Sequence, residues 1–149
     1  MPQDKPQFEV IDEFNGIAKK IVEKYHDVFD GIDYTQIRCV ALTNRERKQG
    51  AKYFSILPVK MPIRMDTPYG WYATIFAEDW TAMDEAHKNV LVFSVLCAIP
   101  QNEEDEGKVN PFDLKDYDII VRNFSVDYMT RADLPDILKD DVKLTTKLD

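Results

Sequence analysis

The sequence is short of the residues that build most cross-linked and catalytic sites in small proteins. It holds two cysteines, two histidines and five glycines among 149 residues. Two cysteines beside apolar neighbours do not make the disulfide framework of a small secreted domain, so we expect buried thiols. The few glycines form neither a phosphate-binding loop nor a nucleophile elbow, which excludes two common kinds of nucleotide and acyl-transfer site.

The chain also lacks a long apolar segment and an excess of basic residues. No stretch approaches the about 20 apolar residues of a membrane span, and MPQDKPQFEV at the start has no apolar signal core. We therefore expect a cytosolic protein that does not contact a membrane. With 19 Lys and Arg against 27 Asp and Glu, the net charge is −8. Such a surface repels phosphate backbones, so we expect no direct nucleic-acid binding, although it suits a basic protein partner.

What the chain does have is enough apolar material for one core. Hydrophobic residues make up 44% and aromatic residues 11%, values typical of a folded domain rather than of a disordered chain. A chain of this length buries its core without disulfides or metal. We predict a flexible arm over residues 1–7, a single domain over 8–129 and a charged C-terminal tail over 130–149.

The order of hydrophobic patterns predicts an α+β fold. Apolar residues at three- and four-residue steps predict helices over Phe8–Phe29, Thr81–Ile99 and Leu114–Phe124. Runs rich in β-branched and aromatic residues predict strands over Ile37–Leu42, Tyr53–Leu57 and Trp71–Ala77. A charged loop with a glycine separates the first two strands, so we expect a hairpin there. The three helices should then pack on a small, mostly antiparallel sheet.

Two segments of the second half carry a resemblance to a known family. HKNVLVFSVLCAIP follows the strand-like WYATIFAEDW and has a polar lead, an apolar middle and a closing proline. Downstream, FDLKDYDIIVRNFSVDYM is similar to a second helix of that family. Both resemble the phage metallopeptidases, a zincin-like family related in outline to the SprT-like group, over residues 8–128. The resemblance implies a zincin-like domain of phage origin that works in the host bacterial cytoplasm.

The family's chemistry depends on H-E-x-x-H in the first of these helices and a third ligand in the second. The resemblance places Ser94 at the first histidine, Val95 at the catalytic glutamate and Ala98 at the second histidine. Phe112 stands at the third ligand. Serine is a poor zinc ligand and the other three side chains have no donor atom, whereas a catalytic zinc needs three ligands and an open water position. The resemblance therefore implies no metal, no cofactor and no peptidase activity.

Two further groups of polar residues are candidates for function. The acidic run Glu103, Glu104, Asp105 and Glu106 predicts an exposed loop and is our candidate contact for a basic partner. Asp84 and His87 are spaced to share one face of a helix, but such a pair more often forms a solvated surface than a metal site.

The favoured hypothesis is a pseudoenzyme, a non-catalytic phage protein that binds a host protein and inhibits or redirects it. The expected kind of target is a nucleic-acid or defence enzyme. Two alternatives stay open. One is a hydrolase with an unrecognised or repurposed site, using groups such as Asp113 and Asp116. The other is a structural phage protein that acts through self-association.

Overall fold

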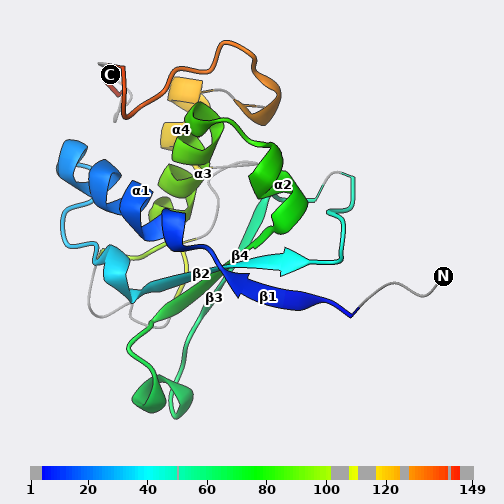
Figure 1. Cartoon of the computed structure of the whole chain (residues 1–149). Coiled ribbons are helices and arrows are strands. Elements are labelled where there is room, and N and C mark those ends of the chain that lie inside the picture. The colour runs from blue at the N-terminus through cyan, green and yellow to red at the C-terminus, as the bar shows by residue number, and fades with distance from the viewer. Residues whose placement is uncertain are drawn as a thin grey trace.

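The computed structural model describes residues 5–49, 51–101, 108–110, 117–124, 128–140 and 142–144. Within them, helices lie on one side of a four-stranded sheet, which confirms the predicted α+β class (Figure 1). The strands are β1 Gln7–Val10, β2 Ile37–Thr43, β3 Phe54–Pro58 and β4 Trp71–Phe76. The α-helices are α1 Asp12–Lys24, α2 Ala77–Ala82, α3 Glu85–Cys97 and α4 Asp118–Phe124. No helix in these ranges is long and apolar enough to cross a membrane.

The strand order is β1-β2-β4-β3, so the predicted hairpin between the strands at 37–42 and 53–57 is wrong. Strand β4 lies between them, parallel to β2 and antiparallel to β3, while β1 is antiparallel to β2. The sheet is therefore mixed, with two antiparallel pairings and one parallel. Burial explains the order: β4 buries Trp71, Ala73 and Ile75, whereas β3 buries Phe54 alone. The strand with the larger buried face takes the central place.

The first predicted helix begins too early. Residues 8–10 belong to β1, in which Phe8 stands opposite Leu42 and Val10 opposite Val40. Phe8 and Val10 are two residues apart, a spacing that places both on one face of a strand. The three- and four-residue steps of the helical pattern also include them, so the sequence alone assigned them to the helix. Helix α1 then begins at Asp12 and buries Phe14, Ala18 and Ile21, as the predicted apolar stripe requires.

The second predicted helix is two helices. Met83 and Asp84 are extended between α2 and α3, and the Asp84 side chain accepts a hydrogen bond from the backbone N–H of His87 at 2.9 Å. Aspartate favours this N-cap position because it satisfies a backbone donor that the helix leaves unpaired. The predicted third helix is confirmed over Asp118–Phe124, and its predicted beginning at residues 114–116 lies outside the described residues.

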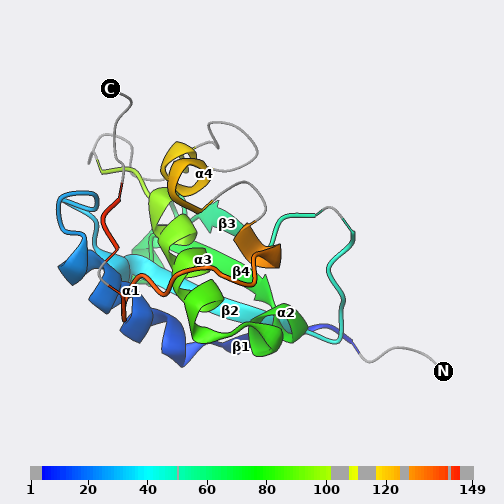
Figure 2. The ribbon, with the colours of Figure 1, turned by 90° about the horizontal axis from the view of Figure 1, so that it is seen from above.

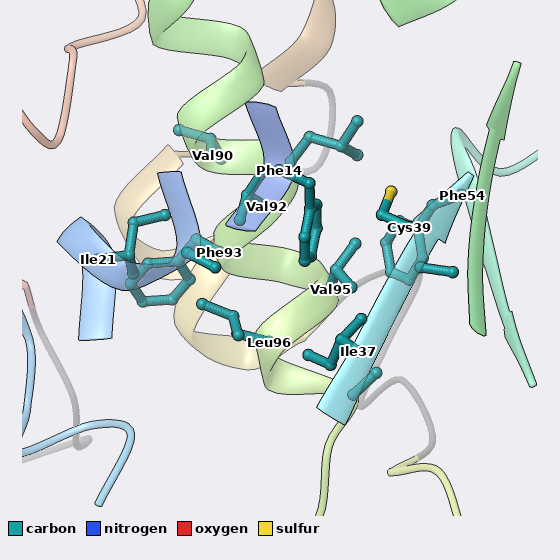
Figure 3. Close-up of a cluster of buried hydrophobic side chains, with 14 of the residues drawn as sticks. Phe14, Ile21, Ile37, Cys39, Phe54, Val90, Val92, Phe93, Val95 and Leu96 are labelled. Carbon is teal, nitrogen blue, oxygen red and sulfur yellow. The ribbon is translucent and has the colours of Figure 1, made fainter. Parts of the chain in front are cut away.

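The core lies between the sheet and the helices α1 and α3 (Figure 2). Helix α3 is its centre, because every residue from Asn89 to Leu96 is buried. Phe93 makes edge-to-face ring contacts with Phe29, Tyr25 and Phe124 at centroid distances of 4.8, 5.9 and 6.4 Å. On the side of the sheet, Ile37, Cys39 and Phe54 complete the cluster (Figure 3). A helix enclosed in this way is apolar on nearly all sides.

The described part of the C-terminal segment packs across the helices (Figure 2). Leu134 and Ile137 are buried in the core. The Tyr25 hydroxyl lies 3.0 Å from the carbonyl oxygens of both Ile137 and Val142, and Lys24 Nζ donates to the Ile137 carbonyl at 2.6 Å. The division into arm, domain and tail stays a prediction, but these contacts attach Ile137 and Val142 to the C-terminal end of α1.

Candidate functional site

The last turn of α3 and its C-cap residue, Ala98, carry the positions that the resemblance assigns to the metal site in this helix. Ser94, Val95 and Ala98 are all 0% exposed. Figure 3 shows Val95 directed from α3 toward strand β2, which carries Ile37 and Cys39. The position assigned to the catalytic glutamate is thus part of the apolar core. Burial of such a side chain stabilises the fold by about 25 cal/mol per Å² of apolar surface.

Ser94 is the polar residue of this buried turn. Its hydroxyl oxygen is buried and has no hydrogen-bond partner among the residues that the structure describes. Leaving a hydroxyl in that state costs about 1–3 kcal/mol. Within the described ranges, no group of three or more His, Cys, Asp or Glu side chains is arranged to hold a metal ion. Phe112, Asp113, Asp116 and the acidic run 103–106 lie outside those ranges.

Cys39 faces the same core from β2. It is buried, and desolvation raises the pKa of its thiol from 9.0 to about 12. The thiolate is the reactive form of cysteine, so a thiol with this pKa is not a nucleophile at neutral pH. The expectation of a buried thiol is confirmed for Cys39, while Cys97 is half-buried.

A cavity of about 310 Å³ opens at the N-terminal end of α3. Its lining combines the end of α2 and the beginning of α3 with the loop before β3 and with Met129: Arg47, Tyr53, Asp79, Ala82, Met83, Asp84, His87 and Met129. The sequence gives no sign of this cavity. Arg47 and Asp79 are far apart in the chain and follow no common pattern, so only their contact in the fold identifies them.

The charged groups of the cavity are paired with one another. Arg47 Nε donates to Asp79 Oδ2 at 2.9 Å, and Arg47 Nη1 donates to the Ala51 carbonyl at 3.0 Å. The guanidinium also lies over the Tyr53 ring, 3.9 Å from its centroid. A guanidinium with three such contacts is held in one orientation. The Arg47–Asp79 pair therefore connects the loop before β3 to α2 along one side of the cavity.

His87 connects α3 to the C-terminal segment. Its Nδ1 lies 2.5 Å from Asp84 Oδ1, and its Nε2 donates to the Arg131 carbonyl at 3.0 Å. The two side chains meet, as their spacing predicts, but Asp84 is the extended N-cap residue of α3 and not part of a helix face. Metal ligation and general-base catalysis both need a ring nitrogen with an available lone pair. Both nitrogens of His87 are engaged, so the residue ties two segments together instead.

The Asp84 cap provides a test of this end of α3. Hydrogen bonds from the backbone and ring of His87 lower the pKa of Asp84 below 3.8. A lowered folded-state pKa contributes stability that is present above the unfolded pKa and is lost as the pH falls through the folded pKa. We expect Asp84→Ala to lower the unfolding free energy by about 1 kcal/mol at pH 7.

Urea unfolding at neutral and strongly acidic pH measures this effect. The difference between Asp84→Ala and the parent should shrink once the pH falls below the folded-state pKa of Asp84. Asp84→Asn is the control, because asparagine keeps the capping oxygen and should lose less at pH 7. A difference that stays the same at both pH values would contradict an ionised cap.

The fold and these residues define a small α+β protein whose central helix is enclosed by the sheet and α1. The profile of the family described as putative phage metallopeptidase matches residues 7–143. The chain therefore belongs to the phage metallopeptidase family, which confirms the resemblance read from the sequence. No curated protein and no solved structure gives a significant match.

Proposed function

We propose that this member of the family is non-catalytic and acts in the host bacterial cytoplasm by binding a host protein, which it inhibits or redirects. One observation carries the proposal: the turn of α3 that the resemblance aligns with H-E-x-x-H is enclosed. Ser94, Val95 and Ala98 have no exposed surface, and they stand in a run of buried residues that extends back to Asn89. A metal-bound water needs an open position beside its ligands.

The side chains at these positions support the same conclusion. A zinc hydrolase needs three donor atoms and a carboxylate that takes up the proton of the water. Val95 and Ala98 provide apolar atoms, and the Ser94 hydroxyl makes no hydrogen bond among the described residues, which also contain no group of three His, Cys, Asp or Glu arranged to hold a metal. Apolar replacement turns a polar site into core, and the fold then serves as a scaffold for surface contacts.

Charge supports a basic host partner. The chain carries −8 overall, and the run Glu103, Glu104, Asp105 and Glu106 concentrates four carboxylates in one segment. Enzymes that hold nucleic acid expose basic grooves, to which an acidic surface is complementary. The expected target is therefore a nucleic-acid or defence enzyme, and the acidic run is our candidate contact.

A metal titration with a peptidase assay tests the non-catalytic part. The full chain is dialysed against zinc, its metal content is measured by mass spectrometry, and hydrolysis of an unstructured protein is followed with and without chelator. We expect far less than one zinc per chain and no chelator-sensitive hydrolysis, because a bound catalytic zinc requires three ligands. One zinc per chain together with chelator-sensitive hydrolysis would establish the hydrolase alternative.

Capture from host lysate tests the binding part. The tagged chain and a variant with Glu103, Glu104, Asp105 and Glu106 changed to lysine are compared by quantitative mass spectrometry. We expect one host protein to be enriched by the parent and lost by the variant, and the association rate to fall with salt. Equal capture by both chains would show that the contact lies outside the acidic run. If the parent enriches no host protein, host binding is contradicted.

A further inference from the structure

The sheet has a second face, opposite to α1 and α3. Along β2 and β4 the residues Ile37, Cys39, Ala41, Trp71, Ala73 and Ile75 are buried beneath the helices. The alternate residues point to the other side, because side chains in a strand alternate between faces. Strand pairing brings ten of them together, which we name the outer face: Phe8, Val10, Arg38, Val40, Leu42, Ser55, Leu57, Tyr72, Thr74 and Phe76.

The outer face is apolar and nearly free of charge. Seven of its ten side chains are aliphatic or aromatic, and none of these seven packs against the core cluster. It holds no carboxylate, although the chain has 27 Asp and Glu. Its single charge, Arg38, donates to the Tyr69 hydroxyl at 3.0 Å and lies 5.1 Å from the centroid of that ring. No described helix covers this face (Figure 1).

The loop between β3 and β4 extends the apolar surface. It contains the short 3₁₀ helix η2, Ile63–Asp66, and projects from the side of the sheet opposite to α1 and α3 (Figure 1). Met61, Ile63 and Met65 in this loop are 72%, 68% and 75% exposed. Leu57, at the base of the loop on the outer face, is 69% exposed. Exposed apolar side chains in one contiguous region are typical of a surface that another protein covers.

We propose that the outer face and the η2 loop form a homodimer interface in which two copies pack sheet to sheet. Two sheets that face each other with apolar side chains form a sandwich about 10 Å thick. The same surface serves both copies, because a two-fold interface is self-complementary. The proposal goes beyond the proposed function and does not depend on it, since dimerisation requires neither a host partner nor loss of metal.

Charge favours a second copy over a charged partner. A basic partner would need several carboxylates, but the outer face has none and the η2 loop has Asp66 alone. An acidic partner would need a cluster of cations, but Arg38 is held by Tyr69 and Arg64 donates to the Thr67 carbonyl at 2.6 Å, which leaves Lys60 of the loop. A surface whose charges are limited to Arg38 on the sheet and Lys60, Arg64 and Asp66 in the loop brings few like charges together when it meets itself.

The contact area of the sheet indicates that the η2 loop must be part of the dimer interface. Four strands about 4.8 Å apart, each contributing about five residues, give a flat footprint on the order of 300 Å². A stable interface buries about 800 Å² per partner. Side-chain relief increases the footprint, but the sheet alone falls short of that area. The three exposed side chains of the loop, Met61, Ile63 and Met65, supply the additional apolar contact.

The first test is the mass of the full chain over a wide concentration range, measured by sedimentation velocity at low and high salt. We expect the mass to rise from 17.3 kDa to twice that value. Because both copies carry the same net charge, salt should tighten the dimer, whereas it would weaken a contact between opposite charges. A monomer at all concentrations and both salt levels would overturn the proposal.

The second test places a lysine within the interface and outside it. Leu57→Lys should weaken dimerisation by at least about tenfold, because it buries a charge against apolar side chains. Gly16→Lys on α1 is the matched control, since a Cβ there meets no heavy atom within 4 Å. It should dimerise as the parent does. Equal dimerisation of both variants, or equal loss in both, would overturn the proposal.

A variant in the loop keeps the proposal testable if the sheet variant fails to fold. Ile63→Ser changes an exposed side chain outside the strands, and we expect it to weaken the dimer while the circular dichroism spectrum stays the same. A parent chain that is monomeric, and that captures a host protein only when Leu57 and Ile63 are intact, would overturn the dimer and assign this surface to the host protein.

Discussion

Val95→Glu is expected to unfold the domain or to leave it only marginally folded. The side chain is fully buried on the side of α3 that faces β2, beside Ile37 and Cys39 (Figure 3). An unpaired carboxylate in such surroundings costs several kcal/mol even if it takes up a proton. A domain of this size has about 5–15 kcal/mol of stability in all. The urea unfolding midpoint, followed by circular dichroism, should fall steeply.

Val95→Thr distinguishes the effect of a buried charge from that of a buried polar group with the shape of valine. Threonine keeps the branched outline of valine but places a hydroxyl in the core, so we expect a smaller loss of about 1–3 kcal/mol. The comparison also bears on function, because a catalytic glutamate at this position would have to reach solvent and substrate. A Val95→Glu chain with the parent midpoint would place position 95 at an accessible site and would support the hydrolase alternative.

Ile137→Ala is expected to lower the unfolding free energy by about 2–5 kcal/mol, the range for deleting a fully buried aliphatic side chain. Ile137 is 0% exposed, although it lies within the segment that the sequence predicts as a charged tail. Its carbonyl oxygen also accepts from Lys24 Nζ and lies 3.0 Å from the Tyr25 hydroxyl. Urea unfolding of the variant measures how far this segment belongs to the cooperative core.

Leu138→Ala is the matched control from the adjacent position. Leu138 is only partly buried, so the same kind of truncation removes less buried surface, and we expect a clearly smaller loss. Small and equal effects of both substitutions would show that the segment around Ile137 contributes little to folding, as a loose tail would. A large effect of Ile137→Ala alone would extend the cooperative domain beyond residue 129.

Much of the local structure follows from patterns in the chain. The stripe that contains Phe14, Ala18 and Ile21 predicts the buried face of α1, and the strands β2, β3 and β4 lie within about a residue of their predicted bounds. The errors occur where two patterns overlap. Phe8 and Val10 fit both periods, and only pairing with β2 places them in a strand. The sequence pattern places Asp84 within one long helix, whereas its capping hydrogen bond to His87 shows that a separate helix begins after it.

For the candidate site, too, some properties follow from the sequence and others only from the tertiary structure. The sequence by itself determined the family, the acidic charge, the classes of most elements and the side chains that stand at positions 94, 95 and 98. Only the tertiary structure decided that these three residues are enclosed, that Ile37 pairs with Trp71 across a parallel pair of strands, and that His87 ties α3 to Arg131. The reason is physical. Periodicity reports which side of an element is apolar, whereas strand order, enclosure and exposed faces depend on contacts between residues far apart in the chain.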